Sequence, residues 1–156
     1  PLGITKGLEP SKKMAEIARG RGISVTEGIA EDIPFGDAGF DLALMVTTLC
    51  FLDDVEKAFS EVFRILEPGG YFINGFVDKN SRLGEIYQEI KHENVFYREA
   101  NFYSVDEVKE YLIKPGFTDF SFSQTIFKDI DDINEIEKVK KGYGPGSFVV
   151  ISAKKP

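Results

Sequence analysis

The sequence predicts an α/β fold with a mostly parallel sheet and an antiparallel C-terminal strand. Strand-like apolar runs alternate with amphipathic helical patterns across short turns containing Gly and Pro, an order typical of parallel strands joined by crossover helices. Residues 40–46, FDLALMV, form a nearly continuous apolar run, as expected of a strand buried on both faces. Residues 117–127 and 147–153 are strand-like and separated only by a loop, which indicates an antiparallel pair closing one edge.

The first part of the chain predicts a strand, a helix and a second strand. A short run at residues 4–8 precedes Pro10 and Ser11, which suit a helix start, and apolar residues at helical spacing follow. Residues 23–27 alternate apolar and polar and contain β-branched side chains, which predicts a strand. Residues 28–39 contain three glycines and a proline, so we expect a loop there.

Two later helices are predicted from their capping residues. Asp53 or Asp54 suits the N-cap of a helix whose apolar residues recur at three- and four-residue steps. Residues 71–77 form the next predicted strand. Ser104, with Glu107 three residues later, predicts a helix that begins with a capping box.

The composition indicates one globular domain and argues against several kinds of partner. The 156 residues are 42% hydrophobic, so we expect residues 1–156 to form a single domain with a sizeable core. A net charge of −7 argues against nucleic acid or an anionic membrane as partner, and no apolar run has the length of a membrane span. The single cysteine excludes an internal disulfide and favours the cytoplasm.

An acidic residue follows the first predicted strand. Glu9 lies at the carboxyl end of residues 4–8, the edge at which open α/β sheets bind ligands. A carboxylate there is well placed to accept hydrogen bonds from the two hydroxyls of a ribose, as the acid after the glycine-rich turn of nucleotide-binding folds does. That turn is absent, because only eight residues precede Glu9. We therefore expect the chain to be an N-terminally truncated version of a longer domain.

The order of several short segments is more specific than any one of them. They are GLEPS (7–11), GIAEDIPF (28–35), FDLA (40–43), FLDD (51–54), RILEPGG (64–70) and SVDE (104–107) leading to PGF (115–117). Together they resemble the class I S-adenosylmethionine-dependent methyltransferases, in particular the group called methyltransferase domain type 11. The resemblance implies a Rossmann-like sheet of seven strands with the last one antiparallel, S-adenosyl-L-methionine as cofactor and a small-molecule methyl acceptor. It also implies a partial domain, since the family's first strand and glycine-rich motif are missing between the strands placed at 4–8 and 40–46.

The resemblance carries over to eight cofactor-binding residues: Glu9, Pro10, Ser11, Ile29, Ala30, Glu31, Val46 and Thr47. Glu9 matches the ribose-binding acid, and the next two residues match positions beside the adenosine. Ile29, Ala30 and Glu31 match the segment that meets adenine, although many relatives have an aspartate in place of the isoleucine. Isoleucine accepts no hydrogen bond, which leaves recognition to the Ala30 backbone, apolar packing or Glu31.

Most of the matched residues also have a purely structural interpretation. Glu9 also suits a solvated strand end, and Glu31 an exposed acid in a loop. Pro10 and Ser11 are fully explained as residues that begin a helix. The last matched pair, Val46 and Thr47, falls at the end of the fourth strand of the family fold, near the cofactor's methyl group, yet the valine also fits a core position.

No residue is marked as a catalytic base, and no metal site is predicted. Methyl transfer from a sulfonium has a very good leaving group, so orientation and desolvation can supply most of the catalysis. His92 is expected at the surface, and Cys50 follows a buried strand and is expected to be an inert thiol. An aromatic cluster suits either a substrate lid or core packing: Phe96, Tyr97, Phe102 and Tyr103.

Two other functions fit the sequence. A nicotinamide-dependent oxidoreductase also places an acid at a strand end to bind a ribose. The 156 residues are also consistent with a non-enzymatic fragment that acts as an interaction module. The predicted antiparallel strand pair and the Glu-Pro-Gly-Gly helix exit at residues 67–70 favour the methyltransferase over the oxidoreductase.

Overall fold

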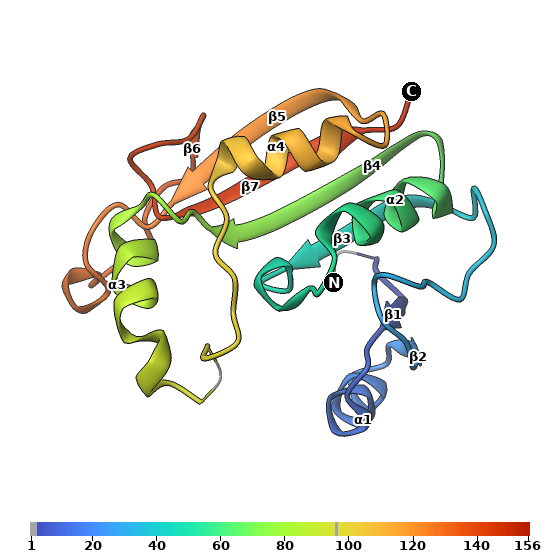
Figure 1. The fold of residues 1–156 in the computed structure, drawn as a ribbon, viewed down its shortest axis with the longest axis horizontal. Helices are drawn as coiled ribbons and strands as arrows, with labels where there is room; N and C mark the ends of the chain where they lie inside the picture. The colour runs from blue at the N-terminus through green and yellow to red at the C-terminus, as the bar shows by residue number, and fades with distance from the viewer. Residues whose placement is uncertain (1–2, 96) are drawn as a thin grey trace.

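The computed structural model describes residues 3–95 and 97–156 (Figure 1). The first elements form a small parallel unit. Its strands β1 (Lys6–Leu8) and β2 (Ser24–Thr26) pair with each other, and helix α1 (Lys12–Gly20) connects them. This unit confirms the strand, helix and strand predicted for the first part of the chain. It lies beside the main sheet in Figure 1, and no strand of the unit pairs with that sheet in the described part of the chain.

The main sheet has five strands. In spatial order they are β3 (Phe40–Val46), β4 (Leu66–Val77), β7 (Phe148–Lys154), β5 (Thr118–Thr125) and β6 (Lys140–Lys141). The first two are parallel, and β7 is antiparallel to both of its neighbours, so β3, β4 and β5 all point the same way. The predicted fold class, mostly parallel with an antiparallel C-terminal strand, is confirmed.

The predicted antiparallel pair of residues 117–127 and 147–153 is confirmed by the pairing of β5 with β7. β7 lies between β4 and β5, and the short β6 pairs with the outer side of β5. The buried residues of β7 alternate along the strand, and their face completes the core under the helices: Val149, Ile151 and Ala153. A strand that buries three apolar side chains is more stable with a partner on each side, because its backbone groups are then satisfied.

Helices α2 (Val55–Ile65) and α4 (Val105–Ile113) cover one face of the main sheet (Figure 1). The remaining helical segments are α3 (Arg82–Ile90) and the 3₁₀ turns η1 (Leu49–Phe51), η2 (Lys91–Glu93) and η3 (Ile130–Asp132). The Asp54 side chain caps α2 by accepting from the backbone N of Lys57 at 3.0 Å, and the capping box predicted for α4 is present. Within the described residues, no helix is long and apolar enough to cross a membrane.

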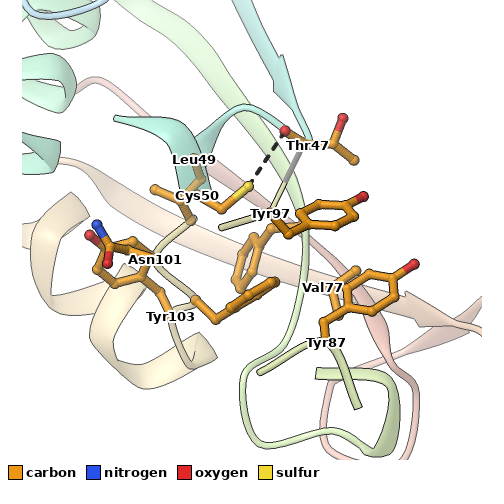
Figure 2. A pocket seen from close by; sticks show the side chains of 10 residues that line it. Thr47, Leu49, Cys50, Val77, Tyr87, Tyr97, Asn101 and Tyr103 are labelled. Atoms are coloured by element: carbon orange, nitrogen blue, oxygen red, sulfur yellow. Dashed lines mark hydrogen bonds between the residues drawn. The ribbon is translucent and has the colours of Figure 1, made fainter. Parts of the chain in front are cut away.

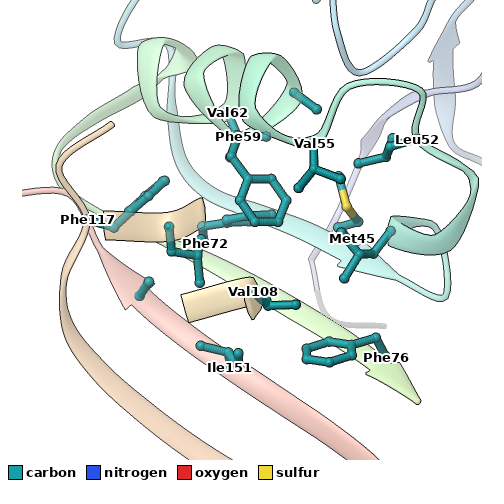
Figure 3. Packing of buried hydrophobic residues seen from close by; sticks show 14 of the residues in the cluster. Met45, Leu52, Val55, Phe59, Val62, Phe72, Phe76, Val108, Phe117 and Ile151 are labelled. Atoms are coloured by element: carbon teal, nitrogen blue, oxygen red, sulfur yellow. The ribbon is translucent and has the colours of Figure 1, made fainter. Parts of the chain in front are cut away.

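The core lies between these helices and the sheet. Phe59 of α2 meets Phe72 of β4 edge to face, with ring centroids 5.2 Å apart (Figure 3). Met45 is the buried residue of β3, whereas Leu44 and Val46 on its other face are 40% and 47% exposed. The predicted burial of residues 40–46 on both faces is therefore wrong, because α2 and α4 cover one side of the sheet and leave Leu44 and Val46 exposed on the other.

Asn74 is a polar residue in the middle of this core. It lies on β4 between Phe72 and Phe76 in the alternation that faces the helices, and it is 0% exposed. Neither its amide nitrogen nor its amide oxygen has a hydrogen-bond partner among the described residues. A buried polar group without a partner costs about 1–3 kcal/mol of desolvation free energy.

Replacing Asn74 by leucine, which has a similar size and no polar atom, is expected to raise the free energy of unfolding by about 1–2 kcal/mol. Urea unfolding of wild type and Asn74→Leu measures the difference, with the exposed Asn80→Leu as control. A lower stability of Asn74→Leu would contradict the expectation and would mean that the amide has a partner in solution.

Candidate functional site

A cleft separates the β1–β2 unit from β3. It offers about 460 Å³ to the centres of water-sized molecules, which lies in the usual range of small-molecule sites. Its walls are the carboxyl end of β1, the loop of residues 28–35, β3, and the segment from Thr48 to Asp53. Five of the eight predicted cofactor-binding residues line it: Glu9, Pro10, Ile29, Ala30 and Glu31.

The Glu9 carboxylate is held at the N-terminus of α1. Its Oε1 accepts a hydrogen bond of 2.9 Å from the backbone N–H of Ser11, whose own hydroxyl accepts from Met14 as the N-cap of α1. Oε2 of Glu9 accepts no hydrogen bond from residues 3–95 or 97–156. The carboxylate is thus oriented and keeps one oxygen for a ligand. Ser11 does not line the cleft, and its position makes it the residue that orients Glu9.

The loop after β2 approaches β1 closely. A Cβ atom on Gly28 would lie 2.9 Å from Cδ1 of Leu8 and 3.4 Å from Cδ of Pro34, so only glycine fits without displacing them. Ile29 is 49% exposed at the cleft, and Ala30 follows it within a turn closed by Asp32 N–H and the Ile29 carbonyl at 3.3 Å. These side chains form an apolar wall that suits the flat face of a nucleobase.

Glu31 is buried and already has protein partners. Its Oε1 accepts from the backbone N–H groups of Asp53 and Asp54, at 3.0 and 3.4 Å. These amides belong to the N-cap residue of α2 and to the residue before it, where a negative charge is stabilised by the helix dipole. The carboxylate therefore joins the loop to the start of α2, and the expectation of an exposed loop acid is wrong because the side chain turns inward to these orphan N–H groups.

The sequence reasoning missed the clamp that fixes the rest of this loop. From α2, Arg64 donates to the carbonyl oxygens of Ile33 and Phe35, at 2.9 and 2.8 Å, and also contacts Asp37. Glu61 accepts from the same guanidinium at 2.7 and 2.8 Å and from the Ile33 N–H at 2.9 Å. The hydrogen bond from Arg64 holds the pKa of Glu61 below its usual range. The available signal was the Glu and Arg pair three positions apart on the polar side of the helix.

The variant Glu61→Gln is expected to lower the free energy of unfolding by roughly 1.5–3 kcal/mol at pH 7, because it removes charge-assisted hydrogen bonds. Since the folded-state pKa of Glu61 is depressed, this stabilisation is present above the ordinary value of 4.5 and is lost as pH falls through the lower folded-state value. Urea unfolding at pH 7 and pH 3 measures it, with Glu110→Gln on exposed α4 surface as control. An equal difference between wild type and Glu61→Gln at both pH values would contradict the assignment.

Val46 and Thr47 lie at the end of β3 and do not line the cleft. Thr47 has a φ of 54°, an unusual backbone conformation for a β-branched residue, and it donates from its N–H to the Gly75 carbonyl at 2.8 Å. This backbone turns the chain from β3 into η1. Such strain is common at functional sites.

Thr47 instead lines a second, smaller pocket beyond the ends of β3 and β4 (Figure 2). Tyr97, Phe102 and Tyr103 of the predicted aromatic cluster line it too, whereas Phe96 lies outside the described residues. Tyr87 of α3 completes the pocket and was not singled out from the sequence, because its place near the others depends on how α3 packs.

Neither Cys50 nor His92 has the surroundings of a catalytic nucleophile or base. Burial raises the pKa of the Cys50 thiol to about 11, so it is neutral at physiological pH, and its Sγ lies 3.8 Å from the Thr47 carbonyl oxygen (Figure 2). His92 is exposed in η2, as expected. The site therefore presents positioning groups and apolar walls.

Comparison with known proteins agrees with this arrangement. Residues 3–74 match a family profile described as "Methyltransferase domain". A solved structure from Thermotoga maritima, TM1293, is described as a "SAM-dependent methyltransferase, possible histamine N-methyltransferase". It is 51% identical with a TM-score of 0.97, and the match covers 100% of this chain and 75% of that one.

Two further relatives carry no functional description. Uncharacterized protein MJ1123 of Methanocaldococcus jannaschii is 46% identical over 155 residues, which cover 99% of this chain and 75% of the relative. Uncharacterized protein Rv2003c of Mycobacterium tuberculosis is 32% identical over 155 residues, which cover 97% of this chain and 54% of the relative. The chain thus spans about half the length of the mycobacterial relative.

Proposed function

Because the chain belongs to the class I S-adenosylmethionine-dependent methyltransferases, we propose that it binds S-adenosyl-L-methionine in the cleft and transfers the methyl group to a small-molecule acceptor. The observation that carries the proposal is the Glu9 carboxylate, oriented by Ser11 at the carboxyl end of a parallel strand and open to the cleft. Family membership supports methyl transfer in general, and the cleft geometry supports this particular site.

The residues present fit the adenosine half of the cofactor. Glu9 would accept from the ribose hydroxyls, and Ile29 and Ala30 would pack on the adenine ring, with the loop held in position by Arg64, Glu61 and Glu31. The bound cofactor supplies an activated methyl group on a sulfonium. Because Glu31 is engaged with α2, the Ala30 backbone is the better candidate for hydrogen bonds to the adenine edge.

Orientation and the exclusion of water are the contributions we assign to the protein. A thioether leaves readily from a sulfonium, so an acceptor that arrives unprotonated needs no base. The neutral Cys50 thiol and the apolar side chains around it suit this role, since they desolvate an acceptor without competing for the methyl group. The acceptor named in the description of TM1293, histamine, is one amine to assay with this chain.

Family membership favours this function over the nicotinamide-dependent oxidoreductase. The titration described below would favour a non-enzymatic role of the 156 residues if it detected no binding of the cofactor product. We keep the partner expectations from the sequence: a small-molecule acceptor, neither nucleic acid nor membrane, and a cytoplasmic location, all supported by the net charge of −7 and the single cysteine.

Glu9→Ala is expected to weaken binding of S-adenosylhomocysteine by roughly 10- to 150-fold, because a charge-assisted hydrogen bond contributes about 1.5–3 kcal/mol. Isothermal titration measures it in this chain and in the longest version of the protein that its gene encodes. The matched control is Glu16→Ala, an exposed acid on α1.

Two results would overturn the proposal. One is the absence of saturable binding in both versions of the protein, which would favour the non-enzymatic role. The other is equal affinity of wild type and Glu9→Ala, which would move the cofactor away from this strand end.

A further inference from the structure

We propose that the second pocket, which lies against the cofactor cleft, binds the methyl acceptor and selects a neutral, planar molecule with a single aromatic ring. The pocket is formed by the ends of β3 and β4, by α3, and by residues 97–103. This inference rests on the proposed function, because an acceptor pocket needs a methyl donor beside it.

The pocket and the cleft share one wall. Thr47, Leu49 and Cys50 line the pocket, and the interleaved Thr48, Phe51 and Leu52 line the cleft. The turn η1 thus stands between the two cavities at the carboxyl end of β3. A group transferred from one ligand to another requires such adjacent sites, because the reacting atoms must approach within about 3–3.5 Å.

The aromatic rings form a stack that spans this wall. Phe51, at the cleft, lies nearly parallel to Tyr97, with an interplanar angle of 15° and ring centroids 6.2 Å apart. Tyr97 in turn lies nearly parallel to Tyr87, at 22° and 5.1 Å (Figure 2). Phe102 is tilted against both tyrosines, at 6.1 and 6.3 Å. The three nearly parallel rings continue from the cleft into the pocket.

This geometry favours a flat ring over a cation. The rings already stack on one another, so a further aromatic ring can extend the series by offset stacking on an outer face. An aromatic cage, the arrangement that recognises quaternary ammonium ions, instead directs several ring faces at one centre. The stacked faces of Phe51, Tyr97 and Tyr87 oppose one another and do not enclose a common point.

The uncharged lining of the pocket also favours a neutral acceptor. None of the described lining residues is Asp, Glu, Lys, Arg or His, so a charged acceptor would lose its hydration without gaining an ion-pair partner. Burial also raises the pKa values of Cys50, Tyr97 and Tyr103, which keeps these groups neutral at physiological pH. For an amine or a ring nitrogen, the neutral form is also the one whose free lone pair attacks a sulfonium.

The room within the walls of the pocket suits one ring. It offers about 40 Å³ to the centres of water-sized molecules. That is room for roughly three waters, or about 90 Å³ of liquid, which is close to one six-membered ring.

The walls are connected by backbone hydrogen bonds. Asn101 N–H donates to the Cys50 carbonyl at 2.8 Å, which attaches the aromatic segment to η1. Lys79 N–H donates to the Tyr103 carbonyl at 3.0 Å, which attaches the same segment to the end of β4. A pocket fixed in this way needs little reordering when a ligand binds.

The test compares four small probes by NMR, with ¹³C-labelled tyrosine and phenylalanine rings. Phenol and imidazole are flat, cyclohexanol has a six-membered ring that is not flat, and tetramethylammonium is a cation. We expect phenol and imidazole to shift the signals of Tyr87 and Tyr97, and phenol to bind roughly 3- to 10-fold more tightly than cyclohexanol.

Variants locate the binding site. Tyr97→Leu and Tyr87→Leu are each expected to weaken phenol binding roughly 3- to 10-fold, while affinity for S-adenosylhomocysteine stays unchanged. Tyr71→Leu, at the opposite end of β4 and 43% exposed, is the matched control and is expected to bind phenol as wild type does. The comparison of phenol with cyclohexanol uses the wild type alone, so it decides the question even where a variant fails to fold.

Three outcomes would overturn the inference while leaving cofactor binding intact. They are equal affinity for phenol and cyclohexanol, preferential binding of tetramethylammonium, and unchanged phenol binding in both folded tyrosine variants. A fourth outcome, phenol binding without any binding of S-adenosylhomocysteine, would overturn the acceptor role together with the proposed function.

Discussion

The cleft depends on the ionic attachment of one irregular loop to α2. Residues 28–39 join the small parallel unit to the main sheet without strand pairing, so their backbone groups need other partners. Arg64 and Glu61 supply these partners for Ile33 and Phe35, and Glu31 attaches the loop to the first amides of α2. The charged face of one helix thereby sets the position of the apolar wall opposite β3.

The end of β3 has a comparable role between the two cavities. The strained backbone of Thr47 turns the chain into η1, where Leu49 and Cys50 line the aromatic pocket and Phe51 lines the cleft. One short turn therefore adjoins both the proposed donor and the proposed acceptor. A small displacement of this turn would alter both sites. Two backbone hydrogen bonds hold it in position, from Asn101 N–H to the Cys50 carbonyl and from Thr47 N–H to the Gly75 carbonyl.

Local patterns predicted the elements well and their surroundings less well. The strands, the Asp54 cap and the capping box of Ser104 and Glu107 follow from residues close in sequence, and the structure confirms them. The predicted burial of β3 on both faces was wrong, because burial depends on what covers each face of a strand. Periodicity describes a strand's faces and does not identify what lies against them.

The sequence by itself determined the family, the order of strands and helices, and the acid at the end of β1, because each depends on residue type and spacing along the chain. Only the tertiary structure decided the rest. It turned Glu31 inward to α2, brought Arg64 to the loop and placed Tyr87 against Tyr97 and Phe102. These contacts join segments up to 31 residues apart, and long-range contacts depend on the packing of helices on the sheet, which no local pattern specifies.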